Sequence, residues 1–136
     1  SRDKDYIFDI SKFSNVIGKT GPYILYTYVR INKIISNFEV NDMNNNIYNE
    51  IDRELRKTII EFDLEVTKAF NDKMPSYIAE YVYNLCVIMN SFYQNNRIID
   101  LEDNNQKNSW IYVLKTANKV LKEMLYLLII DIPTVM

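Results

Sequence analysis

Glycine and proline, the residues that most often interrupt regular structure, are scarce in this sequence. Two glycines and three prolines occur in 136 residues. Many-stranded sandwiches and barrels need numerous turns, so this scarcity disfavours them and favours long helices. Hydrophobic residues make up 48% of the chain, which is enough to build one core. We therefore expect one all-α domain over residues 1–136, a bundle of four to five helices.

Apolar residues recur at spacings of three and four in several segments, as they do on the buried face of a helix. The expected helices span about 22–37, 48–61, 62–71, 75–93 and 107–130, and the second continues or bends into the third. Asparagine-rich stretches at 38–48 and 94–106 predict loops. Residues 1–20 are expected to form a lead-in, and Pro133 to end regular structure.

The residue types present exclude several kinds of chemistry. The chain has no histidine and a single cysteine, Cys86, which rules out an internal disulfide, histidine-dependent triads and a structural zinc site. Gly18-Lys19-Thr20 resembles the end of a phosphate-binding loop, but the required earlier glycine is replaced by Phe13. Carboxylates such as Asp52 and Glu54 fall at helical surface spacing and are expected to be solvated. We expect no catalytic or metal site, and Cys86 to be a buried core residue.

Charge and hydropathy bear on the partners and the location of the protein. The net charge is -2, whereas nucleic-acid-binding domains are usually basic, so only a local basic patch would suit such a partner. The longest apolar run near the C-terminus, 124–130, is too short to span a bilayer, and residues 1–9 lack the apolar region of a signal peptide. The single cysteine suits a reducing compartment. We expect a cytoplasmic location, with no membrane and no DNA partner.

The first expected helix has two organised faces. Its apolar stripe consists of Ile24, Tyr28, Ile31 and Ile35. A second stripe, roughly 130° away by helical geometry, combines aromatic rings with positive charge and consists of Tyr23, Tyr26, Arg30, Lys33 and Asn37. Tyrosine rings can stack against bases of single-stranded or looped RNA while cations hold the phosphates.

Two interpretations of this second stripe stay open on the pattern alone. In the first, the stripe is a stacking platform for RNA bases. In the second, Tyr23 and Tyr26 fill a groove against a neighbouring helix and Arg30 pairs with a carboxylate. Two interpretations also stay open for Tyr93, at the end of the helix expected over 75–93. It is either a further RNA contact or a boundary residue of that helix.

Four segments of the chain resemble the C-terminal anticodon-binding domain of arginyl-tRNA synthetases, an all-α domain of the DALR type found on class I synthetases. The segments are Phe8-Asp9-Ile10, TGPYILYTYVRI at 20–31, AEYVYNLCVIMNSFY at 79–93 and IPTVM at 132–136. The TGPY segment together with the closing P-x-x-M is the most specific part. Leu25 and Tyr28 depart from the family's common glutamine and histidine.

The resemblance implies a function for the second stripe. It implies that Tyr23, Tyr26, Arg30 and Tyr93 face the anticodon loop of arginine tRNA, and that Met136 packs near the anticodon; Lys33 extends the basic part of the same face. The chain would then position arginine tRNA for aminoacylation. The alternative is a helical protein-interaction or structural module without RNA binding.

The resemblance also implies that this chain is a fragment of a larger arginine–tRNA ligase. The catalytic domain, which uses ATP and Mg, would lie elsewhere in the same polypeptide and would be a partner of this domain. The chain itself is then expected to need no cofactor and not to charge tRNA alone.

Overall fold

The computed structural model describes residues 21–39, 46–73 and 75–127, and all regular structure in these ranges is helical. The elements are α2 (Gly21–Ile35), α3 (Glu50–Ile60), α4 (Phe62–Asp72), α5 (Pro75–Asn95), a 3-10 helix η1 (Ile98–Asp100) and α6 (Asn104–Leu127). Five α-helices in the described ranges confirm the predicted all-α bundle. The lead-in over 1–20 and the region around Pro133 lie outside the described residues.

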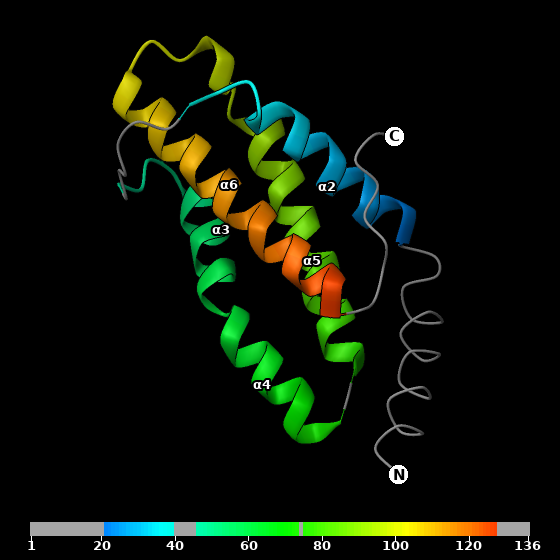
Figure 1. Cartoon of the computed structure of the whole chain (residues 1–136). Helices are drawn as coiled ribbons and strands as arrows, with labels where there is room; N and C mark the ends of the chain where they lie inside the picture. Colours follow the sequence, from blue (N-terminus) through cyan, green and yellow to red (C-terminus); the bar gives the residue numbers. More distant parts are fainter. Residues whose placement is uncertain (1–20, 40–45, 74, 128–136) are drawn as a thin grey trace.

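The long helix α5 is the centre of the bundle. It contacts α2, α3, α4 and α6, and α6 in turn contacts α2 and α3. Figure 1 shows α2 on one side of the α5–α6 pair, and α3 followed by α4 on the other. As a result α2 has one flank along α5 and another along α6.

The core is formed by the apolar stripes of these helices, and its aromatic centre is Phe92 on α5 against Trp110 on α6. Their rings meet edge to face, with centroids 5.7 Å apart. The largest fully buried side chains are Ile24, Ile31, Leu55, Val82, Leu85, Met89, Phe92, Ile111, Leu114, Leu121, Met124 and Leu125. Fully burying one such side chain stabilises the fold by about 1.5–3 kcal/mol before the entropic cost of folding.

The inner stripe of α2 differs from the predicted one at one position. Thr27 is fully buried between Ile24 and Ile31, whereas Tyr28 is only half-buried. The Thr27 hydroxyl donates to the backbone oxygen of Tyr23 at 2.8 Å, so its burial leaves that donor satisfied. Tyr28 instead lies on the flank of α2 that faces α6.

The boundary before α6 was also predicted incorrectly. The helix begins at Asn104 rather than near 107, and η1 occupies part of the expected loop. The Asp103 carboxylate accepts hydrogen bonds from the backbone N–H groups of Asn105 at 2.9 Å and Gln106 at 3.4 Å. An aspartate in this position satisfies donors that a helix start leaves free, so it extends the helix toward its N-terminus.

Asp52 is fully buried, and the expectation that it is solvated is wrong. Its carboxylate accepts hydrogen bonds from Arg56 Nε at 2.6 Å, Trp110 Nε1 at 3.1 Å and the backbone N–H of Tyr48 at 3.0 Å. Arg56 also donates through Nη2 to Ser109 Oγ at 2.7 Å. These bonds join α3 to α6 and to the segment before α3. Helical spacing could not reveal the burial, because Trp110, the partner on α6, lies far away in the sequence.

Two ionisable groups are buried in the core around α5. Burial raises the pKa of the Cys86 thiol from 9.0 to about 12, with a smaller opposing effect from its hydrogen bond with Thr27. Burial, together with the nearby carboxylates Glu61 and Glu65, also raises the pKa of Tyr81, whose hydroxyl donates to the backbone oxygen of Thr58 at 2.6 Å. The prediction that Cys86 is a buried residue is confirmed.

We expect Asp52→Asn to lower the free energy of unfolding by about 3 kcal/mol, because it leaves the Arg56 guanidinium without its counter-charge in a mostly buried position. Urea denaturation followed by circular dichroism measures the loss. Glu54→Gln, on the exposed side of the same helix, is the matched control and should change stability by less than about 0.5 kcal/mol. Equal losses in the two variants would contradict the structural role of Asp52.

We expect stability to fall in alkaline solution as Cys86 and Tyr81 lose their protons. Both pKa values are higher in the folded chain. The stabilisation is therefore complete below about pH 9 and is lost as the pH rises toward about 12, by up to ~1.4 kcal/mol per pH unit and per group. Urea denaturation at neutral pH and near pH 11 measures the loss. It should be smaller in Cys86→Ala and in Tyr81→Phe, and an unchanged loss in both variants would refute the assignment.

Candidate nucleic-acid interface

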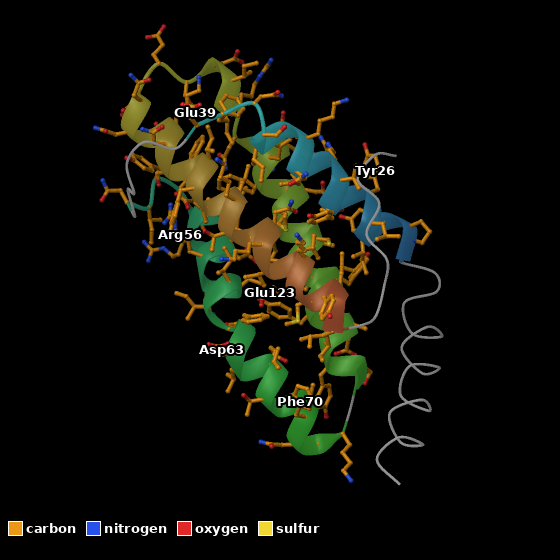
Figure 2. All side chains as sticks on the ribbon, viewed as in Figure 1. Tyr26, Glu39, Arg56, Asp63, Phe70 and Glu123 are labelled. Carbon is orange, nitrogen blue, oxygen red and sulfur yellow. The ribbon has the colours of Figure 1, made fainter. Side chains whose placement is uncertain are left out.

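The aromatic and basic residues predicted on the first helix lie along its flank with α5. There a groove with a volume of about 580 Å³ is lined by Tyr23, Tyr26, Arg30, Val87, Asn90, Ser91 and Gln94. Figure 2 shows Tyr26 on the outer side of α2, away from α3 and α4. Its side chain is 51% exposed, which makes it the accessible aromatic ring of this groove.

Asn90 forms the floor of the groove and holds the residues around it. It is 8% exposed. Its Oδ1 accepts a hydrogen bond from Arg30 Nη1 at 3.1 Å. Its Nδ2 lies 2.9 Å from Thr27 Oγ1 and 3.0 Å from both Tyr23 Oη and the Cys86 backbone oxygen, so its two N–H bonds are shared among three acceptors. One buried amide thus orients both a cation and a tyrosine of α2.

The sequence did not single out Asn90, although one signal for it exists. It is a polar residue within the apolar face of α5, four residues after the buried Cys86. A buried amide needs partners for its donors and its acceptor, so its place on the apolar face predicts a polar group on a neighbouring helix. That neighbour is α2, but periodicity alone does not say which helices meet.

Arg30 is held by two contacts, neither of which neutralises its charge. Besides the bond to Asn90, its guanidinium carbon lies 5.2 Å from the centroid of the Tyr93 ring. Within the described part of the chain it forms no ion pair with a carboxylate, contrary to the second interpretation of this face. An arginine oriented between an amide and a ring keeps further N–H donors for an anion or a base edge.

Tyr23 and Tyr26 do not occupy equivalent environments. Tyr23 is half-buried, and its ring packs against Tyr83 of α5 with centroids 5.8 Å apart and an angle of 52° between the rings. It partly fills the groove, as the second interpretation held, whereas Tyr26 does not. Tyr23 is therefore held by α5 through its ring and through the bond between its hydroxyl and Asn90, whereas Tyr26 is the more exposed ring of the groove.

The remaining predicted residues fall in different places. Tyr93 is half-buried and meets the groove through its contact with Arg30. Lys33 is exposed in the last turn of α2 and does not line the groove. Met136 lies outside the described residues. The structure thus brings Tyr23, Tyr26, Arg30 and Tyr93 together and places Lys33 farther along the helix.

Two other properties bear on what the described residues can do. In these ranges no three acidic or cysteine side chains are grouped so that they could hold a metal ion. The same ranges contain no helix with the length and hydropathy that a membrane span requires. What the groove offers is an aromatic face, an oriented cation and polar edges, the elements that recognise unstacked nucleotides.

Comparison with known proteins places the chain in a family. The DALR anticodon binding domain family matches residues 24–136. The arginine–tRNA ligase of Alkaliphilus oremlandii (strain OhILAs) is 36% identical over 135 residues, which cover 96% of this chain and 23% of the ligase. That of Francisella tularensis subsp. novicida (strain U112) is 34% identical over 139 residues, covering 95% and 24%. The chain therefore spans about a quarter of the length of the curated relatives it matches. With most of its length matched, the chain belongs to the DALR anticodon-binding domain family.

Proposed function

We propose that this chain binds the anticodon loop of an arginine tRNA in the groove between α2 and α5. Anticodon binding is the role of the family to which the chain belongs, so its partner is a tRNA. The names of the relatives, arginine–tRNA ligases, support arginine as the amino acid. The observation that carries the location is the half-exposed Tyr26 ring beside Arg30, whose guanidinium is oriented by Asn90 and Tyr93.

Binding in this groove uses stacking and hydrogen bonds at the same time. An unstacked base lies against the exposed face of Tyr26, a contact worth ~1–3 kcal/mol. Arg30 then donates to a phosphate or to a base edge. On the opposite wall, Ser91 and Gln94 supply donors and acceptors for the Watson–Crick edge of the base. We include Met136 in the proposal because the resemblance implies that it packs near the anticodon.

The domain contributes positioning rather than bond chemistry. Anticodon binding supplies energy that holds the distant acceptor end of the tRNA in reach of a catalytic centre. We place that centre, with its ATP and Mg, elsewhere in the same polypeptide, because the relatives are about four times as long as this chain. We propose no cofactor for the domain itself. We place aminoacylation of the tRNA in the cytoplasm.

Titration of the chain with an arginine-anticodon stem-loop, and with a stem-loop of scrambled loop sequence, tests the proposal at low salt. We expect tighter binding of the arginine stem-loop. Tyr26→Ala should weaken that binding by about 5-fold or more, because a stacked base loses ~1–3 kcal/mol. Arg30→Ala should also weaken the binding of the arginine stem-loop, and Arg30→Lys should restore less than the native affinity because lysine lacks the planar fork.

Phe70→Ala is the matched control for the tyrosine variant. Phe70 is an aromatic residue that is 68% exposed, and Figure 2 places it on α4, on the other side of the bundle from α2. Its removal should leave the affinity for both stem-loops unchanged. Equal binding of the two loops, insensitive to Tyr26→Ala and Arg30→Ala, would contradict the site. Absence of binding to either loop would favour a helical interaction module without RNA binding.

A further inference from the structure

A second groove lies on the other flank of α2, where that helix meets α6. Its volume is about 400 Å³, and it is lined by Tyr28, Asn32, Ile35, Ser36, Phe38, Lys115, Asn118, Lys119 and Lys122. All three charged residues in this lining are lysines, although the chain as a whole has a net charge of -2. Positive charge is therefore concentrated in this groove.

The three lysines form one row along α6. Positions 115, 119 and 122 fall on the same side of a helix and span about 10 Å of its axis. Lys115 is half-buried and donates from Nζ to the Phe38 backbone oxygen at 3.2 Å. Lys119 and Lys122 are exposed, and within the described ranges neither forms an ion pair. The following residue, Glu123, lines an adjoining groove toward the end of α6, and Lys119 and Lys122 line that groove as well.

A hydrogen-bond acceptor without a partner lies beside these lysines. Asn118 is 3% exposed, and its Nδ2 donates to the Tyr28 backbone oxygen at 3.3 Å. Its Oδ1 accepts no hydrogen bond from the described residues, despite being buried. A ligand that suits this groove carries negative charge for the lysines, and it can donate a hydrogen bond to Asn118 Oδ1 only if the amide turns toward the groove, because that atom is buried.

We propose that the α2–α6 groove binds the sugar–phosphate backbone of the anticodon stem of the same RNA, an inference that rests on the proposed function. One strand of B-DNA presents about one phosphate per 3.4 Å of helix axis, and an RNA stem has a spacing of the same order, so the lysine row matches several consecutive phosphates. The ribose 2′-hydroxyl is a donor of the kind that Asn118 lacks. An acidic protein segment would also bring donors, its backbone N–H groups, so the choice of RNA rests on the neighbouring groove between α2 and α5, which one stem-loop can occupy at the same time.

The position of Lys33 connects the groove between α2 and α6 with the groove between α2 and α5. Helical geometry places Lys33 on the outer ridge of α2, opposite the buried stripe of Ile24, Ile31 and Ile35. One groove lies on each side of that ridge. A stem-loop seated with its loop against α5 can cross the ridge and continue along α6, with Lys33 against a phosphate between the two grooves.

The double variant Lys119→Gln/Lys122→Gln tests the proposal against the arginine-anticodon and scrambled stem-loops over a range of salt concentrations. Each lost phosphate contact lowers the slope of log affinity against log salt by about 0.7–0.9, so we expect the slope to fall by about 1–2. Affinity at low salt should fall for both RNAs. The preference for the arginine loop should persist, because phosphate contacts carry no sequence information.

The matched control is Lys57→Gln/Lys73→Gln, which removes the same charge from exposed lysines of the α3–α4 side. It should leave the slope unchanged, and melting temperatures of both double variants show whether they are folded. An unchanged slope in Lys119→Gln/Lys122→Gln with the loop preference intact would overturn RNA binding in the α2–α6 groove but not the anticodon site. It would favour an acidic protein segment as the ligand of the α2–α6 groove. A reduced slope without any loop preference in the native chain supports the groove and overturns the anticodon site. Absence of RNA binding at low salt overturns both.

Discussion

The rest of the bundle depends on the burial of one carboxylate, that of Asp52. A charge removed from water must be matched by donors, and here the donors come from three places: Arg56 on the same helix, Trp110 on α6 and the backbone of Tyr48. Meeting that requirement sets where α3 begins and how it lies against α6. Because α6 also packs on α5 and α2, the placement of α3 and the shape of both grooves beside α2 are connected.

The same principle operates on a smaller scale at the groove between α2 and α5. Asn90 is a buried amide that forms hydrogen bonds with residues of α2. These bonds orient Arg30 and Tyr23 before any ligand arrives. A guanidinium already held against the Tyr93 ring loses less rotamer freedom on binding than a free one would. Tyr26 needs no such support, since a stacking surface requires only exposure. The groove therefore combines one ordered cation with one accessible ring.

Helical periodicity predicted the five helices and the two faces of α2, because the spacing of apolar residues reports directly which side of a helix is buried. It failed where burial depends on a partner distant in sequence. Asp52 has the spacing of a surface residue yet is buried by Trp110, and Thr27 rather than Tyr28 enters the core because it meets Asn90. It also cannot show the two-sided arrangement of grooves, which arises from the packing of α2 on two helices at once.

A groove lies on each flank of α2. The angular position of a residue around the helix axis therefore determines which groove its side chain reaches. Inserting or deleting a single residue would turn everything beyond that point by about 100°. Such a change would carry Arg30 away from Asn90 and bring a different residue to the rim of each groove. Arg30 follows Tyr23 by seven positions, close to two full turns, and this spacing brings both side chains to the same amide. A substitution in α2 changes the contacts of one side chain, whereas a change in its length moves every side chain beyond that point, so both grooves depend on the register of this helix more than on any single residue.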